Sequence, residues 1–171
     1  MHFPLFVDLA GRECLVVGAG KIAARKAKTL ESFGARVKTV APETAGRGFE
    51  ESDVEGMALV VAATDDHGLN ARVSAICRAR GIPVNAVDDP ANCTFFFPAI
   101  ARNGPVTAAV STGGACPAAA AILRDRIAGL MDDGFAAKVE KLGGERERLK
   151  KEFPDPEERR RHCEEELNGR P

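Results

Sequence analysis

The most constraining feature of this sequence is a glycine-rich turn that joins a short apolar run directly to a helical stretch. Residues 13–17 read ECLVV and continue into Gly18-Ala19-Gly20-Lys21-Ile22-Ala23. This is the G-x-G-x-x-A form of the dinucleotide-binding pattern: the first glycine makes the tight turn, the second lets the backbone approach a pyrophosphate, and the alanine allows the helix to pack closely on the strand. The helix N-terminus adds N–H donors and positive potential. The pattern predicts a nucleotide site.

The residues that follow predict an α/β fold, with a Rossmann-type parallel sheet and crossover helices. Apolar residues at i, i+4 and i+7 predict a helix that Gly34 ends, and residues 36–41 (RVKTVA) read as a second strand. Residues 57–64 (MALVVAAT) and 82–87 (IPVNAV) read as further strands, separated by an amphipathic helix that Asp65-Asp66 are placed to cap. Residues 44–56 hold too few periodic apolar positions for more than a loop with one helical turn.

The character of the chain changes after the last of these strands. Two β-rich runs, 94–101 and 106–111, are joined by RNGP and predict a hairpin. An apolar hairpin of this kind is usually covered by a partner, so we expect a homodimer formed here. Pro117 begins a predicted helix with Leu123, Ile127 and Leu130 on one face, and the charge-rich tail predicts two helices. The expected domains are 1–92 for the nucleotide, 93–131 for dimerisation, and 132–171 as a helical segment.

Composition narrows the class of protein. Lys and Arg total 24 against 25 Asp and Glu, so a net charge of −1 gives no general reason to bind nucleic acid or an anionic membrane. The five cysteines are widely spaced and form no CxxC, and the three histidines are dispersed, so we expect neither a disulfide scaffold nor a permanent metal site. The N-terminal stretch meets Asp8, Arg12 and Glu13 early, which predicts no signal peptide or membrane span and favours the cytoplasm.

Several residues at predicted strand ends are candidates for holding the cofactor. Glu43, just beyond the second strand, suits the adenosine ribose hydroxyls and would favour NAD by repelling the 2′-phosphate of NADP; a solvated loop glutamate is the equal alternative. Pro42 would form a wall of the adenine pocket. Arg47 leaves NADP as an alternative cofactor, because an arginine can bind its 2′-phosphate. Thr64 and Asp65 are expected to line the cofactor.

Asp88 and Asp89 follow the strand at 82–87 and have two interpretations. From spacing alone they are a polar turn before Pro90, where aspartate is common. Asp88 nevertheless lies at the carboxyl end of a strand expected near the nicotinamide. A proton acceptor is needed there if a substrate loses a hydride and a proton together.

These motifs together resemble the precorrin-2 dehydrogenase/sirohydrochlorin ferrochelatase family, the N-terminal module of siroheme synthases. The resemblance rests on the FPLF start, the Arg-Lys pair after GxGxxA, AATDD, N-x-VD-x-P, FFFPA and S-T-G-G-x-x-P, which in this order cover nearly the whole chain. It implies NAD-dependent oxidation of precorrin-2 to sirohydrochlorin, insertion of ferrous iron in some members, and a homodimer.

The resemblance also assigns roles to individual positions. Gly18, Gly20, Lys21 and Ile22 would lie along the pyrophosphate, Pro42 and Glu43 would meet the adenosine, and Asp88 would be the general base. The matches to the tetrapyrrole cleft are Ser111, Thr112, Gly113 and Gly114. Because the substrate carries many carboxylates, Arg102, Arg124 and Arg126 become candidate clamps, with solvated surface arginines as the alternative.

Two departures from the family pattern stand out. The stretch between Pro42 and AATDD is short, lacking most of a helix and a strand, and Cys116 replaces a serine that would cap the next helix better. Two alternatives to the dehydrogenase stay open: a non-catalytic NAD-sensing module, and a chelatase that has lost dehydrogenation because of the short stretch.

Overall fold

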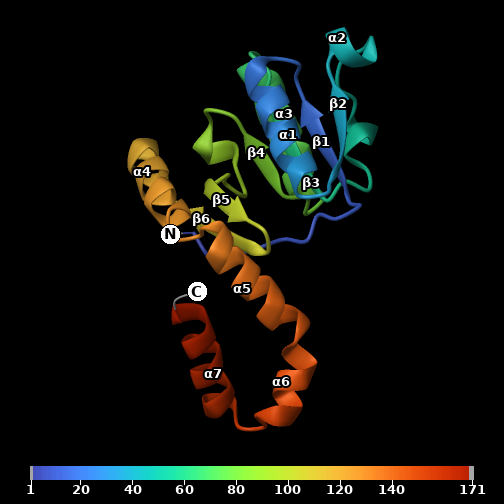
Figure 1. Ribbon diagram of the computed structural model, residues 1–171. Helices are drawn as coiled ribbons and strands as arrows, with labels where there is room; N and C mark the ends of the chain where they lie inside the picture. Colours follow the sequence, from blue (N-terminus) through green and yellow to red (C-terminus); the bar gives the residue numbers. More distant parts are fainter. Residues whose placement is uncertain (1, 170–171) are drawn as a thin grey trace. The chain divides into compact units, whose positions relative to one another are not determined.

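The computed structural model describes residues 2–169, and the chain divides into two compact units, residues 3–96 and residues 97 onward. The first unit holds a four-stranded parallel sheet in the order β2-β1-β3-β4 (Figure 1). Its main elements are β1 (Glu13–Val17), α1 (Lys21–Ser32), β2 (Arg36–Val40), β3 (Leu59–Ala62), α3 (His67–Ala79) and β4 (Val84–Ala86). The α/β fold with a Rossmann-type parallel sheet is confirmed.

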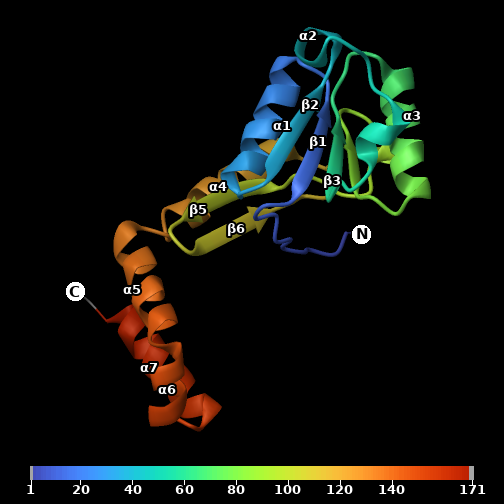
Figure 2. The same ribbon diagram turned by 90° about the vertical axis from the view of Figure 1, so that its right-hand side faces the viewer.

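The strand order reverses direction at β1, which places the two long helices on opposite faces of the sheet. The chain moves from β1 to β2 on one side and from β3 to β4 on the other. Because parallel crossovers are right-handed, α1 and α3 must cover different faces, as Figure 2 shows. The point between the carboxyl ends of β1 and β3 is therefore the switch point, where open α/β sheets bind ligands.

Burial explains why the strands formed where the apolar runs predicted them. The residues of β3 and β4 are all buried, as is β1 after its first residue, because helices cover both faces. The core is rich in valine, including Val16, Val60 and Val84, each with no exposed surface. β2 lies at the sheet edge and alternates in exposure. Its position leaves its outer backbone edge unpaired within the described part of the sheet.

Only short helical segments connect β2 to β3, as the length of this stretch predicted. They are α2 (Pro42–Ala45) and the 3-10 turn η1 (Glu51–Val54). The structure thus has two helical turns here, whereas the sequence predicted one at most. The second turn forms because the backbone N–H of Glu50 donates to the Asp53 carboxylate at 3.0 Å, a local bond that apolar periodicity does not reveal.

The predicted strand at 94–101 is wrong over its first half. Residues 94–98 are irregular, and β5 begins at Ala99. The cause lies in β4, because Thr94 exchanges hydrogen bonds with Val84: its N–H donates to the Val84 carbonyl at 2.8 Å, and its Oγ1 accepts from the Val84 N–H at 2.7 Å. Asn85 Nδ2 also donates to the Phe95 carbonyl at 3.0 Å. These bonds tie the segment to β4 instead of to the hairpin.

The second unit contains the predicted hairpin and the charged tail. β5 (Ala99–Asn103) pairs with β6 (Val106–Val110) in antiparallel register, and α4 (Pro117–Ala128) packs on both strands, burying Ala120. The tail forms three helices instead of two: α5 (Asp133–Gly144), α6 (Arg146–Glu152) and α7 (Pro156–Asn168). The extra break falls at Glu145, directly after two glycines, which weaken a helix.

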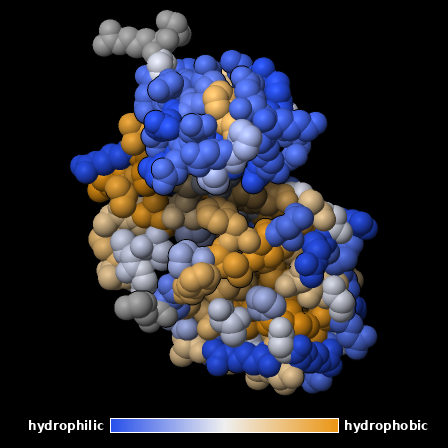
Figure 3. Space-filling view, turned by 90° about the horizontal axis from the view of Figure 1, so that it is seen from below, coloured by the Kyte–Doolittle hydropathy of each residue, from blue (hydrophilic) through white to orange (hydrophobic). Residues whose placement is uncertain are grey.

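The surface of the second unit is uneven in character. In Figure 3 the C-terminal helices show a largely hydrophilic surface. In contrast, α4 leaves Ile122 56% exposed and Leu123 48% exposed, and Leu130 just beyond it is 75% exposed. None of the helices in residues 2–169 is long and apolar enough to cross a membrane.

Candidate active site

Gly18 occupies a position at the switch point that no other residue can take. Its φ is +122°, and an ideal Cβ would lie 2.3 Å from the Ala63 carbonyl oxygen. Its N–H donates to the Val40 carbonyl at 2.9 Å. The turn after β1 is thus held against the ends of both neighbouring strands, and its glycine is required by backbone contact.

The N-terminus of α1 leaves open space and unused donors beside this turn. Gly20 is the N-cap, it supplies no side-chain cap, and the first helical turn contains no acidic residue. A Cβ on Gly20 would meet nothing within 4 Å. Lys21 and Ile22 are exposed, whereas Ala23 is 1% exposed and packs inward. Uncapped N–H groups facing open space fit the pyrophosphate of a dinucleotide.

The loop between β3 and α3 is held by a residue that the sequence analysis missed. Asn70, buried in α3, accepts from the Thr64 hydroxyl at 2.8 Å and the Thr64 N–H at 3.2 Å, and its Nδ2 donates to the Thr64 carbonyl at 2.9 Å. Asp66 caps the helix by accepting from the Leu69 N–H, and Asp65 is exposed. The sequence held one signal for Asn70: it is a polar residue three positions before Val73, which places it on the apolar face of the predicted helix.

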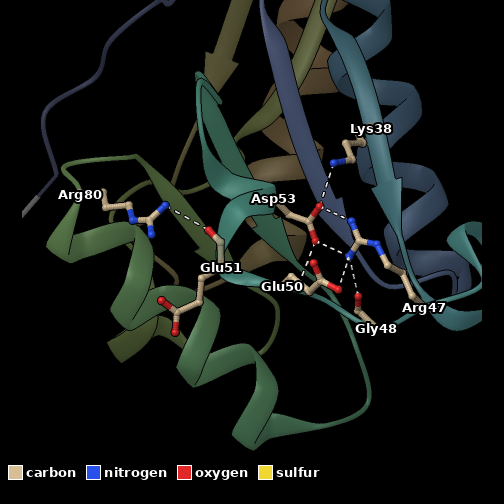
Figure 4. A network of polar contacts seen from close by, with 7 residues as sticks. All are labelled: Lys38, Arg47, Gly48, Glu50, Glu51, Asp53 and Arg80. Carbon is tan, nitrogen blue, oxygen red and sulfur yellow. Dashed lines mark hydrogen bonds and ion pairs between the residues drawn. The ribbon is translucent and has the colours of Figure 1, made fainter.

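The end of β2 carries Pro42 and Glu43 in the first turn of α2, and both are exposed. Arg47 is not directed at them. Its Nη1 and Nη2 donate to the Asp53 carboxylate at 2.9 and 2.7 Å, and Lys38 Nζ donates to the same carboxylate at 2.8 Å (Figure 4). The Arg47 guanidinium is the main cause that holds the pKa of Asp53 well below its usual range. Glu43 is therefore the charged group exposed directly after β2.

The two aspartates in the turn after β4 differ in their contacts and backbone geometry. Asp89 caps the 3-10 turn η2 (Pro90–Asn92): its Oδ2 accepts from Asn92 Nδ2 at 2.7 Å, and its Oδ1 accepts from the Asn92 N–H at 3.3 Å. Asp88 is exposed and has a φ of +58°, a value that non-glycine residues rarely adopt. Strain of this kind clusters at functional sites, so the geometry favours Asp88 as the chemically active member.

Residues outside the recognised motifs hold this turn in place. Ser74, fully buried in α3, donates to the Asn92 carbonyl at 2.7 Å, and Arg78 donates to the Ala91 carbonyl. Cys93 Sγ donates to the Ala86 carbonyl at 3.1 Å and accepts from the Ala86 N–H at 3.2 Å. Burial raises the pKa of the Cys93 thiol, so it stays a neutral donor. The sequence analysis gave none of these residues such a role.

Lys26 in α1 is a further charged group close to the turn. Burial lowers the pKa of this half-buried lysine, and neighbouring Arg25 adds to the effect, while Cys93 and Asp88 act in the opposite direction.

The residues assigned to the tetrapyrrole lie in the second unit. Ser111 and Thr112 form a turn in which Gly113 and Gly114 both have positive φ. Thr112 Oγ1 accepts from the Cys116 N–H at 3.1 Å, and Ser111 Oγ accepts from the Gly113 N–H at 3.1 Å. Cys116 makes no side-chain cap for α4, which confirms that it caps poorly.

The three arginines do not form one cluster with that turn. Arg102 lies in β5 and Arg126 in the last turn of α4, about 14 Å along the helix from Pro117 at 1.5 Å per residue. Arg124 Nε donates to Asp125 at 2.6 Å, so its charge is already partly used. Among the described residues no group of three or more histidine, cysteine, aspartate or glutamate side chains is placed to hold a metal ion.

This fold and this site define a Rossmann-type nucleotide-binding protein. Residues 5–99 match the model of a family described as "Putative NAD(P)-binding", and the chain belongs to that family.

Comparison with curated proteins finds siroheme synthases. The protein from Ectopseudomonas mendocina (strain ymp) is 44% identical over 180 residues, covering 97% of this chain and 39% of the relative. The protein from Thioalkalivibrio sulfidiphilus (strain HL-EbGR7) is 41% identical, covering 98% and 37%. The chain thus spans about two fifths of the length of these relatives. The resemblance to siroheme synthases expected from the motifs is confirmed.

A solved structure shares the fold over the whole chain. It is SirC, precorrin-2 dehydrogenase, with a TM-score of 0.62 and 22% sequence identity, covering 99% of this chain and 100% of the other. At this identity the match shows the fold.

Proposed function

We propose that this chain oxidises precorrin-2 to sirohydrochlorin in siroheme biosynthesis, using NAD. The observation that carries the proposal is the Asp88 turn. An exposed carboxylate is held at positive φ at the carboxyl end of β4, at the same sheet edge as the glycine turn after β1. The siroheme synthase relatives and the fold of the precorrin-2 dehydrogenase support this choice of substrate.

The roles of the chain's own residues follow from their positions. The pyrophosphate lies against the α1 N-terminus, along Gly18, Gly20, Lys21 and Ile22, and Ala23 lets α1 pack closely on the sheet. Thr64 and Asp65 line the nicotinamide side. Pro42 and Glu43 meet the adenosine, which favours NAD. When bound, the nicotinamide supplies the hydride acceptor.

Asp88 takes the proton in this proposal. The oxidation removes one hydride and one proton from the reduced macrocycle, so a carboxylate that accepts the proton balances the step, and the proton then leaves to solvent. Ser74, Arg78 and Cys93 position the turn without touching substrate.

The second unit supplies substrate contacts and the subunit interface in this proposal. The turn of Ser111, Thr112, Gly113 and Gly114 contacts the macrocycle. The candidate partners for its carboxylates are Arg102, Arg124 and Arg126. The exposed apolar residues Ile122, Leu123 and Leu130 favour a homodimer formed through α4 and the hairpin.

Insertion of ferrous iron into sirohydrochlorin is the second proposed activity. It requires removal of two protons from pyrrole nitrogens as the iron substrate enters, and Asp88 is an exposed carboxylate suited to accept protons. This activity needs no resident metal.

Asp88→Asn tests the proposal, because asparagine tolerates positive φ and the variant removes only the charge. We expect turnover of precorrin-2 to fall about 100-fold or more while the Kd for NAD changes little. Glu31→Gln, an exposed change at the far end of α1, is the matched control and should leave turnover unchanged. Full turnover in Asp88→Asn would exclude Asp88 as the base and favour another proton acceptor, whereas NAD binding without turnover in the wild type would favour the NAD-sensing module.

A further inference from the structure

Asp53 pairs with two cationic side chains, Lys38 in β2 and Arg47 in the segment after β2. Its carboxylate accepts from Lys38 Nζ, from both terminal nitrogens of Arg47 and from the Glu50 N–H (Figure 4). The residue is only 3% exposed, whereas the Arg47 side chain is 39% exposed. One buried anion thus holds two cations that solvent can still reach.

The position of this cluster matters because the segment after β2 meets the adenosine ribose in Rossmann folds. An acidic residue there binds the 2′-hydroxyl of NAD, and an arginine there accommodates the 2′-phosphate of NADP. This chain offers both, since Glu43 follows the last residue of β2 by three positions and Arg47 follows it by seven.

At that end of β2 Glu43 is exposed, whereas Arg47 is paired with Asp53. Asp53 lies beside Lys38, two residues before the end of β2, or about 7 Å back along the strand at 3.3 Å per residue. The Arg47 guanidinium is drawn to the same place. Arg47 is therefore directed back along β2, and Glu43 is left at the strand end.

We propose that Asp53 sets the cofactor specificity of this chain by withholding Arg47 from the 2′-phosphate of NADP. Asp53 does not contact the cofactor in this role; it is a positioning residue that acts through Arg47. The assignment rests on the proposed function, because it requires that the chain binds a nicotinamide dinucleotide at the α1 N-terminus.

The hold on Arg47 is strong for two reasons. Drawing the guanidinium away would leave a buried carboxylate short of two charge-assisted hydrogen bonds, which is more costly than losing a surface ion pair. Asp53 also remains ionised across the physiological range, because Arg47 and Lys38 lower its pKa. An incoming 2′-phosphate would face this competition and the exposed Glu43 carboxylate together.

The test is calorimetric titration of NAD and NADP into four forms of the full chain: the wild type, Arg47→Gln, Asp53→Asn and the double variant. We expect the wild type to bind NAD at least about tenfold more tightly than NADP, and Arg47→Gln to leave both Kd values within about twofold. Asp53→Asn should release Arg47 and tighten NADP binding about tenfold with little change for NAD, and adding Arg47→Gln should remove that gain.

A purely structural role for Asp53 would weaken both dinucleotides equally and would overturn the assignment. Equal affinity of the wild type for NAD and NADP would overturn it too. If Asp53→Asn fails to fold, Arg47→Gln still decides: a severalfold loss of NADP affinity would show that Arg47 already contacts the 2′-phosphate. Binding of neither dinucleotide by the folded wild type would instead overturn the proposed function, and this assignment with it.

Discussion

Gly18 and Gly20 belong to the same sequence pattern, but the structure predicts opposite consequences when each is changed to alanine. At Gly18 the new Cβ would lie 2.3 Å from the Ala63 carbonyl oxygen, in a backbone with φ of +122°. At Gly20 the φ is −69° and the Cβ would meet nothing within 4 Å. Gly18→Ala therefore perturbs the fold, whereas Gly20→Ala perturbs only the space for a ligand.

The magnitudes follow from the two kinds of strain. An alanine in a sparsely populated backbone region costs about 1–3 kcal/mol, and forcing β1 away from β3 costs about 1–3 kcal/mol more, so Gly18→Ala should lose about 2–6 kcal/mol of unfolding free energy. Gly20→Ala changes an N-cap from glycine to alanine, which costs about 1 kcal/mol or less. Its Cβ would nevertheless point into the space assigned to the pyrophosphate.

Urea unfolding followed by circular dichroism measures the first effect, and titration with NAD measures the second. We expect Gly18→Ala to unfold at much lower urea concentration. Gly20→Ala should keep nearly wild-type stability and lose about tenfold or more in NAD affinity. Equal stability of the two variants would refute the close contact between Gly18 and Ala63. Unchanged NAD affinity in Gly20→Ala would refute the placement of the pyrophosphate.

Three further predictions concern the residues that hold the site. Asn70→Leu should cost about 1–3 kcal/mol, measured by urea unfolding, since it leaves the Thr64 N–H and carbonyl without their partner; no change would mean the loop is held otherwise. Because the pKa of Asp53 is lowered in the folded state, its contribution to stability is complete above the unfolded pKa of about 4 and is lost as pH falls below it. Thermal unfolding from pH 5 to pH 2 should thus show a steeper acid decline for the wild type than for Asp53→Asn, and parallel declines would contradict the pairing. Cys93→Ala should lower precorrin-2 turnover more than NAD affinity because it loosens the Asp88 turn, whereas equal losses in both would indicate a general defect.

The fold was largely predictable because its strands are apolar runs bounded by turn residues. The buried strands β1, β3 and β4 lie within the predicted ranges, and the predicted ranges of β3 and β4 run one or two residues longer at each end. The prediction failed at residues 94–98 because three phenylalanines resemble a strand, whereas the hydrogen bonds of Thr94 and Phe95 to β4 join residues ten positions apart and leave no local pattern.

The candidate site was predictable where chemistry has a local signature. The glycine turn and the aspartate pair are short motifs, yet spacing did not distinguish Asp88 from Asp89, and only the structure shows that Asp89 is paired with Asn92. The role of Asn70 depends on its side chain pointing inward to Thr64. The roles of Ser74 and Asp53 depend on partners distant in sequence, Asn92 and Lys38. For Asn70 and Ser74 the sequence offered one signal, a polar residue beside the apolar positions of a predicted helix.

The central claim is tested most directly by mixing the purified chain with precorrin-2 and NAD under anaerobic conditions and recording the absorbance of NADH and of the macrocycle together. The account predicts that NADH and the sirohydrochlorin spectrum grow at the same rate, with one NADH formed per macrocycle oxidised. With a verified substrate and an active control enzyme, an unchanged spectrum despite measured NAD binding would contradict the dehydrogenase.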